Sequence, residues 1–404
     1  MSNDRIVELR IAGLRSLVDV RLELDGLTVL IGENGTGKSS ILEAWEILRR
    51  ATRPTFMDEL YAVHGGLADL QSREAPLLDL GITVRGPGDR LSYRLALIRD
   101  GSLTTIHTEC LRLESPRGRP RRIGIIERST SSAKVYDERR KDVLAQVPPA
   151  GRTLLSIFAE RPPHPAIARM VQVLAGIDIH LPFEVRAGWA SREFSRSTAR
   201  DANDVRPLAA LPRYGLQLSN AYQQLKNRPA RQWQETLEDV RLGLGQDVED
   251  VVIQTMPEGS RVALAVKYRA LAEPVSMRML ADGALAYLAF VALFKLTTHR
   301  TLLAFDEPET HLHPNLLARV LDHFEAASHQ YPVVLATHSD RLLDALSDPV
   351  ASVVACDTGD DGTTRLRRLD ARRLESWLRR YRGVGEIRSA GHERSILGPA
   401  ERPT

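Results

Sequence analysis

The chain has 404 residues, 43% of them apolar, so it is long enough for one large domain or two modest ones with a real core. The formal net charge is only +3, which argues against a globally basic nucleic-acid-binding chain. Cys110 and Cys356 are isolated in the sequence, which argues against a disulfide scaffold or a cysteine zinc site.

The N-terminal residues lack the layout of a signal peptide. The most apolar stretch, residues 285–296, is too short to span a bilayer. We therefore expect a cytoplasmic protein that does not enter a membrane.

The first third of the chain predicts strands around one helix. Residues 5–31 alternate apolar and polar residues and end in an apolar strand at 27–31, and a helix follows to about residue 50. Residues 77–136 hold several short alternating runs separated by glycine-containing turns. This pattern predicts an antiparallel β-meander.

The middle of the chain predicts helices. Residues 153–175 and 216–243 have helical patterns, and the polar stretch 191–204 between them predicts a mobile loop. A β-hairpin is expected over 251–256 and 261–269.

The last third returns to an α/β pattern. Apolar strands at 302–305 and 333–336 flank a helix at 313–327, and this strand–helix–strand spacing implies a parallel sheet. Residues 357–362 predict the turn of a further hairpin.

The last forty residues are rich in arginine. A solvated helix face in an arginine-biased chain is the simplest interpretation, and a surface for nucleic acid or an acidic partner is the alternative. Nine of the eleven arginines in these forty residues lie close together, namely Arg365, Arg367, Arg368, Arg372, Arg373, Arg379, Arg380, Arg382 and Arg388.

A phosphate-binding loop lies between the strand at 27–31 and the helix after it. The pattern G-x-x-x-x-G-K-S is formed by Gly32, Glu33, Asn34, Gly35, Thr36, Gly37, Lys38 and Ser39, with Ser40 following. Glycines let backbone N–H groups turn toward phosphate oxygens at a helix N-terminus. Lys38 can reach the β- and γ-phosphates, and Ser39 can offer its hydroxyl to Mg²⁺. Lysine is rare here, with six residues against 49 arginines, so a chance match is improbable.

Two carboxylates end the apolar strand at 302–305. Asp306 is suited to hold Mg²⁺, usually through water, and Glu307 to orient and deprotonate an attacking water. A surface acidic pair after a strand is the simpler alternative, but the phosphate loop upstream favours the catalytic interpretation.

Two further segments complete the pattern. An apolar helix begins with Leu280, Ala281, Asp282 and Gly283. A helix start that contains glycine is a second candidate anion site. In the structural alternative, Gly283 only permits tight packing. His338 ends the strand at 333–336 and can hydrogen-bond a γ-phosphate or a water, although a lone histidine is more often structural.

The order of these motifs resembles the ATP-binding cassette (ABC) ATPases. Within them the chain resembles the RecF/SMC-like branch that includes the OLD-family ATPases and stand-alone AAA15-type relatives. The matching segments are 13–17, 31–40, 280–283, 305–314 and 337–339. The resemblance implies that Arg15 contacts nucleotide, that 307–314 is a D-loop, and that ATP binds between two copies, with 280–283 of one facing Lys38 of the other. A zinc pair at His311 and His313 is the alternative for the D-loop histidines.

Two features depart from that family. Ala281 stands where the signature usually has serine, so a hydroxyl to the γ-phosphate is missing and closure or turnover is expected to be weaker. About sixty residues follow His338, too few for the TOPRIM nuclease domain of OLD nucleases. We therefore expect the biological output to reside in another polypeptide.

These observations predict an α/β P-loop head with a mixed or parallel sheet, an antiparallel meander and a helical insert. The expected divisions are residues 1–145 and 246–356 for the two halves of the head, 146–245 for a helical lobe, and 357–404 for an arginine-rich hairpin and helix.

The expected function is Mg²⁺-dependent ATP hydrolysis by a homodimer, or a higher even oligomer, that gates a separately encoded nuclease or toxin in defence against phage or plasmids. The alternatives are a RecF-like DNA-binding ATPase in repair and an ATP-locked scaffold with little turnover.

Overall fold

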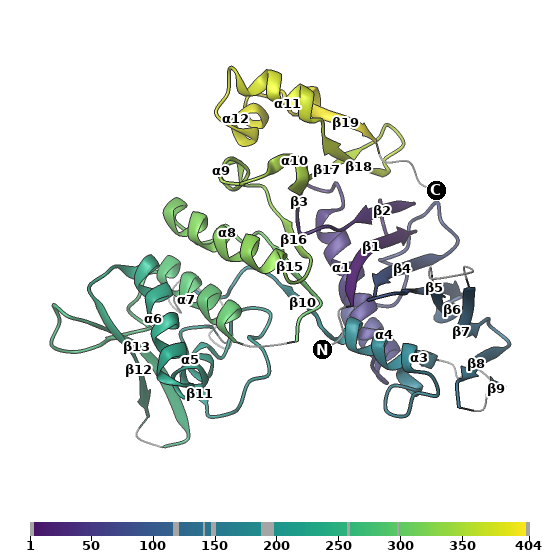
Figure 1. Cartoon of the computed structure of the whole chain (residues 1–404), viewed down its shortest axis with the longest axis horizontal. Helices are drawn as coiled ribbons and strands as arrows, with labels where there is room; N and C mark the ends of the chain where they lie inside the picture. The colour runs from purple at the N-terminus through teal and green to yellow at the C-terminus, as the bar shows by residue number, and fades with distance from the viewer. Residues whose placement is uncertain are drawn as a thin grey trace.

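The computed structural model describes residues 4–115, 121–139, 142–146, 151–186, 198–256, 259–296 and 299–400. Within them, an antiparallel sheet of eight strands has the order β2-β1-β4-β5-β6-β7-β8-β9 (Figure 1). Its strands are β1 (Arg5–Ala12), β2 (Val20–Glu23), β4 (Leu78–Arg85), β5 (Arg90–Asp100), β6 (Leu103–Ser115), β7 (Arg121–Arg128), β8 (Ala133–Asp137) and β9 (Asp142–Gln146).

A second sheet, which we call the core sheet, has the order β10-β15-β16-β3-β17-β18-β19. Its first five strands pair in parallel, and the last two are antiparallel additions. The strands are β10 (Ile177–His180), β15 (Leu302–Asp306), β16 (Val333–Ala336), β3 (Leu27–Ile31), β17 (Val353–Thr358), β18 (Thr364–Leu369) and β19 (Leu397–Ala400).

Each face of the core sheet packs into its own hydrophobic core, because successive side chains of a strand point to opposite faces. Leu30, Ala304 and Val334 pack with α1 (Lys38–Arg50) and the antiparallel sheet. Phe305 and Leu335 pack on the other face with α7 (Asp282–Lys295) and α8 (Pro314–Ser328). Helix α1 therefore lies between the two sheets.

A lobe formed by residues 203–256 and 259–276, called the lobe from here on, packs against α7 at the lower left of Figure 1. It contains α5 (Leu218–Lys226), α6 (Ala230–Leu244), β11 (Asn203–Asp204), β12 (Val248–Thr255), β13 (Arg261–Tyr268) and β14 (Val275–Ser276). The remaining helices are α2 (Phe56–His64), α3 (Leu154–Ile157), α4 (Pro165–Ala175), α9 (Asp340–Asp344), α10 (Pro349–Ser352), α11 (Ala371–Leu378), α12 (Val384–Ser389) and α13 (Glu393–Ile396).

The fold matches the predicted α/β class with an antiparallel meander. The structure corrects the helical lobe expected over 146–245, because β10 is the edge strand of the core sheet and pairs with β15. Helix α4 likewise packs in the core of α1 and the antiparallel sheet. Four residues are too short a run for a reliable strand signal, and a neighbouring strand from elsewhere in the chain decides their state.

The mobile loop predicted over 191–204 is wrong for its second half. Residues 191–197 lie outside the described residues, but Ala199, Arg200, Ala202 and Asn203 are buried. The predicted hairpin is present as β12 and β13, with residues 257 and 258 of its turn outside the described residues.

Candidate functional site

The phosphate loop connects β3 to α1 at the carboxyl edge of the core sheet. Gly32, Gly35 and Gly37 have φ angles of 147°, 82° and 93°. A Cβ at Gly32 would lie 2.3 Å from the carbonyl oxygen of Cys356, and one at Gly37 would lie 2.9 Å from Thr364 Oγ1. Glycine at these positions therefore lets the loop lie directly against β17 and β18.

Lys38 is the first residue of α1 and is only 6% exposed. Its Nζ donates to the carbonyl oxygens of Gly32 at 2.8 Å and Glu33 at 2.9 Å. Burial lowers the pKa of this ammonium group. An ammonium has three N–H donors, and two are used in these bonds. The cation is thus held inside the loop, where an anion would offset its desolvation.

Ser39 and Asp306 join the loop to the end of β15. Ser39 Oγ donates to Asp306 Oδ2 at 3.0 Å across 267 residues of sequence. Burial raises the pKa of Asp306, and the neighbouring Glu307 carboxylate adds to the rise, whereas the bond from Ser39 opposes it. The Ser39 hydroxyl and the Asp306 carboxylate face each other and offer the oxygen ligands that Mg²⁺ prefers, and Mg²⁺ usually keeps several bound waters. The pair therefore fits Mg²⁺.

Glu307 follows Asp306 and is exposed at the same edge. Its φ of 49° is unusual for a residue other than glycine. Its backbone N–H donates to the carbonyl oxygen of Ala336 at 2.7 Å, which ties the turn to the end of β16. Strained backbone of this kind persists where the surrounding structure enforces it, often at functional sites.

His338 lies beside this turn, two residues after the end of β16. Its backbone N–H donates to Glu309 Oε1 at 3.1 Å, and Thr337 Oγ1 donates to the same oxygen at 2.6 Å. The carboxylate of Glu309 thus connects the segment after Glu307 to the His338 loop. Glu309 lies within the segment 305–314, but the sequence pattern does not predict this connecting role.

Arg15 lies beside the first two turns of α1, close to the phosphate loop. It pairs with the carboxylate of Glu43, and its Nη1 donates to Ser40 Oγ at 3.2 Å. His64 Nδ1 lies 2.9 Å from Glu43 Oε1, the oxygen that also accepts from Arg15 Nη2. The Arg15 side chain is 44% exposed, so it is accessible to solvent beside the phosphate loop.

The segment 280–283 forms the start of α7, with Ala281 exposed at the N-cap. A Cβ at Gly283 would lie 2.9 Å from the carbonyl oxygen of His311, so Gly283 permits close packing against the D-loop. Asp282 forms an ion pair with Arg200. These contacts tie the segment to the D-loop and to Arg200 of its own chain.

Arg200 lies in the segment 191–204, which its polar sequence predicts to be a mobile loop. Its side chain is 7% exposed. The guanidinium donates to the carbonyl oxygens of Val185, Met277, Arg278 and Leu280 at distances from 2.6 to 3.1 Å. It therefore organises the loop that precedes α7, and only its tertiary contacts reveal this.

The D-loop histidines have separate environments. His311 has φ of 68°, whereas His313 Nδ1 accepts from the Asn315 N–H at 3.4 Å and caps α8. In the described part of the chain, no group of three or more His, Cys, Asp or Glu side chains is arranged to hold a metal.

The arginine-rich tail is only partly a solvated face. Arg367 and Arg373 donate to carbonyl oxygens of Gly398 and Leu397, and Arg388 donates to that of His338. The exposed members of the set include Arg372, Arg379, Arg380 and Arg382.

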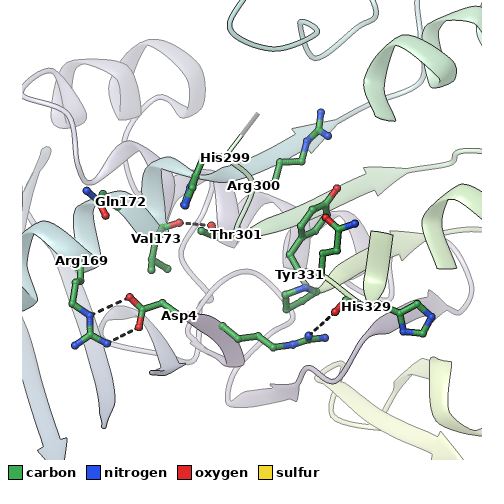
Figure 2. Close-up of a pocket in the computed structure, with 12 residues that line it drawn as sticks. Asp4, Arg169, Gln172, Val173, His299, Arg300, Thr301, His329 and Tyr331 are labelled. Carbon is green, nitrogen blue, oxygen red and sulfur yellow. Dashed lines mark hydrogen bonds and ion pairs between the residues drawn. The ribbon is translucent and has the colours of Figure 1, made fainter. Parts of the chain in front are cut away.

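A hollow of about 360 Å³ lies at the opposite, amino edge of the core sheet (Figure 2). There Arg169 pairs with Asp4, and Arg5 donates to carbonyl oxygens at the end of α8. Arg300 points away from the hollow and donates to Asp178 at 2.7 Å. These cations join elements of the fold, so the hollow does not rival the carboxyl edge as a site.

The described helices include none that is both long and apolar enough to cross a membrane.

Two family models match the chain. Residues 5–85 match an "AAA ATPase domain", and residues 154–344 match an "AAA domain, putative AbiEii toxin, Type IV TA system". A comparison with curated proteins finds no match.

Several solved structures are similar in fold. An SMC head bound to the C-winged helix domain of ScpA has a TM-score of 0.54 at 15% identity, covering 92% of this chain and 99% of that one. An Smc head with an extended coiled coil, bound to the C-terminal domain of ScpA derived from Pyrococcus furiosus, has a TM-score of 0.48 at 14% identity, covering 93% and 99%. An SMC head from Thermotoga maritima has a TM-score of 0.41 at 11% identity, covering 91% and 100%.

Proposed function

We propose that this chain, an ATPase with the fold of an ABC-type head, hydrolyses ATP with Mg²⁺ between two of its copies and thereby controls a separately encoded effector. The observation that carries the proposal is the bond between Ser39 and Asp306, which unites the phosphate loop with the carboxylate turn.

Each residue at the carboxyl edge has a proposed role. Lys38 binds the β- and γ-phosphates, and Ser39 and Asp306 hold Mg²⁺, which would neutralise charge on the phosphates. Glu307 orients the attacking water and accepts its proton, and His338 donates or accepts a hydrogen bond at the γ-phosphate. Phosphoryl transfer needs mainly positioning and charge stabilisation, which this set supplies.

A second copy would complete the site. Ala281 is exposed, and the contacts of 280–283 are with Arg200 and His311 of the same chain rather than with the phosphate loop. A two-fold arrangement would let this helix start face the nucleotide held by Lys38 of the other copy, and a symmetric pair would make two such sites. Arg15, beside the loop and partly exposed, would contact the same nucleotide.

The proposed effector is a nuclease or a toxin-like protein in defence against phage or plasmids. The family matched by residues 154–344 is itself described as a putative toxin of a toxin–antitoxin system, which supports a role in a system of that kind without naming an effector. The lobe and the C-terminal residues 371–396 are the surfaces proposed for the partner.

Ala281 favours slow turnover, since no side chain caps α7 or offers a hydroxyl to phosphate. An ATP-locked scaffold is therefore the second candidate. Because several arginines of the tail are exposed, the test must also distinguish a DNA-binding ATPase from an ATPase that controls a protein effector.

The test compares the wild-type protein with Glu307→Gln. We expect the variant to bind ATP with nearly unchanged affinity, to hydrolyse it about 10²–10⁴-fold more slowly, and to accumulate as an ATP-bound dimer in sedimentation. Wild-type hydrolysis by Glu307→Gln would remove Glu307 as the base.

Negligible hydrolysis by the wild type, with ATP-dependent dimerisation intact, would favour the scaffold. Stimulation of hydrolysis by duplex DNA would favour the RecF-like function. Cleavage of DNA by the purified chain would contradict the proposal of a separate effector.

A further inference from the structure

We propose that Arg388, on α12 and outside the nucleotide motifs, is a positioning residue for the ATPase site that acts by holding the His338 loop. The inference rests on the role proposed for His338, and it makes residues 371–396, here called the C-terminal module, part of the hydrolytic machinery.

The main chain of His338 is held from two sides. Its N–H donates to Glu309 Oε1 at 3.1 Å, and its carbonyl oxygen accepts from Arg388 Nη1 at 3.2 Å. Glu309 follows the Asp306–Glu307 turn, whereas Arg388 comes from the end of the chain. The His338 backbone is therefore clamped between the carboxylate turn and the C-terminal module, which fixes the point from which its side chain extends.

Arg388 is itself firmly placed. Its Nη1 also donates to Asp340 Oδ1 at 2.9 Å, and its Nε donates to Glu393 Oε2 at 3.3 Å. The other oxygen of Asp340 accepts from Ser389 Oγ at 2.5 Å. The side chain is only 16% exposed. A charged donor with several acceptors loses little further freedom when it binds the carbonyl, so the bond can position the loop.

Helix α12 approaches α9 too closely for a loose contact. A Cβ at Gly385 would lie 1.9 Å from the carbonyl oxygen of Asp340. The Gly385 N–H also donates to Asp344 Oδ1 at 2.7 Å. Because α9 starts two residues after His338, a displacement of α12 would be transmitted to the His338 loop.

The experiment measures ATP hydrolysis and nucleotide affinity for Arg388→Ala and Arg388→Gln. The matched control is Arg379→Ala, which removes an exposed arginine of the same module. We expect kcat to fall about 10- to 100-fold in Arg388→Ala, the size of one lost bond to a charged group. ATP affinity should change less than about threefold, because Lys38 and the loop are intact. Arg388→Gln, which keeps an amide N–H donor group on a shorter and uncharged side chain, should fall between Arg388→Ala and the wild type.

A double-mutant cycle with His338→Ala separates positioning from general destabilisation. If Arg388 acts through His338, Arg388→Ala should slow the His338→Ala enzyme by less than about twofold. An equal loss in both backgrounds, or wild-type kcat in Arg388→Ala and Arg388→Gln, would overturn the inference.

If Arg388→Ala does not fold, Arg388→Gln tests the inference by the same two measurements, the loss of kcat and the double-mutant cycle with His338→Ala. Glu307→Gln in the same assay tests the proposed function separately. An active Glu307→Gln enzyme would refute the catalytic assignment, whereas an inactive one beside unaffected Arg388 variants would refute only this inference.

Discussion

The two edges of the core sheet use the same residue types in opposite ways. At the amino edge, Arg169 donates to Asp4 and Asp89, and Arg300 donates to Asp178. At the carboxyl edge, Lys38 is buried against carbonyl oxygens, and burial raises the pKa of Asp306. Charges that satisfy one another join elements of a fold, whereas charges held in costly surroundings mark the place where a ligand is stabilised.

The largest effect expected from this comparison is on nucleotide binding. Lys38→Ala removes the only cation in the loop motif and should weaken ATP binding about 10²–10⁴-fold, as expected for two charge-assisted hydrogen bonds to phosphate. Calorimetric titration with ATP measures it. Arg169→Ala at the amino edge is the control and should leave the affinity unchanged; equal losses would mean that the two edges do not differ in function.

Ala281→Ser probes the site from the second copy. At each of the two sites of the dimer, the new hydroxyl should add about 1.5–3 kcal/mol to ATP-dependent dimerisation through a hydrogen bond to the γ-phosphate. Sedimentation with and without ATP gives the dimer constant. Serine would also cap α7 and stabilise the monomer by about 1 kcal/mol, so thermal unfolding without ATP provides the control. A more stable monomer with an unchanged dimer constant would mean that 280–283 does not contact nucleotide.

Arg169→Ala tests the structural edge directly. The side chain is 24% exposed and pairs with two carboxylates. Its loss should reduce the free energy of unfolding by about 1–3 kcal/mol, less than for a fully buried pair. Urea unfolding measures the change. Arg161→Ala, which removes an exposed arginine just before α4, should be neutral; if both variants unfold like the wild type, the ion pairs do not support the fold.

Asp306→Asn should give the smallest effect, a small increase in thermal stability, whereas Arg169→Ala should lower stability. Because its pKa is raised in the folded state, Asp306 stabilises the fold most when protonated, and this contribution is lost as pH rises through the raised pKa. Without nucleotide and Mg²⁺ at neutral pH, the Asn variant should therefore melt about 1–2 °C higher than the wild type. The difference should shrink in acid, near the ordinary aspartate pKa of about 4. A variant that melts lower at neutral pH would contradict this.

The sequence by itself predicted the class of the fold and which residues lie together at the carboxyl edge. Residues 32–39 are contiguous, and a glycine-rich turn between a strand and a helix specifies its own local geometry. Asp306 and Glu307 end an apolar strand, and parallel strands bring such ends to one edge. The meander was equally predictable, because its strands are paired by short local turns.

Only the tertiary structure decided which distant residues support that edge. Arg200, Glu309 and Arg388 make their contacts with backbone and carboxylates that no periodicity connects to them. In the sequence, Arg388 is one of eleven arginines in the last forty residues, a tail that resembles a solvated surface. The strand β10 becomes a strand because β15 lies beside it. Such roles depend on contacts between segments far apart in the chain, and the local propensity of a segment does not predict those contacts.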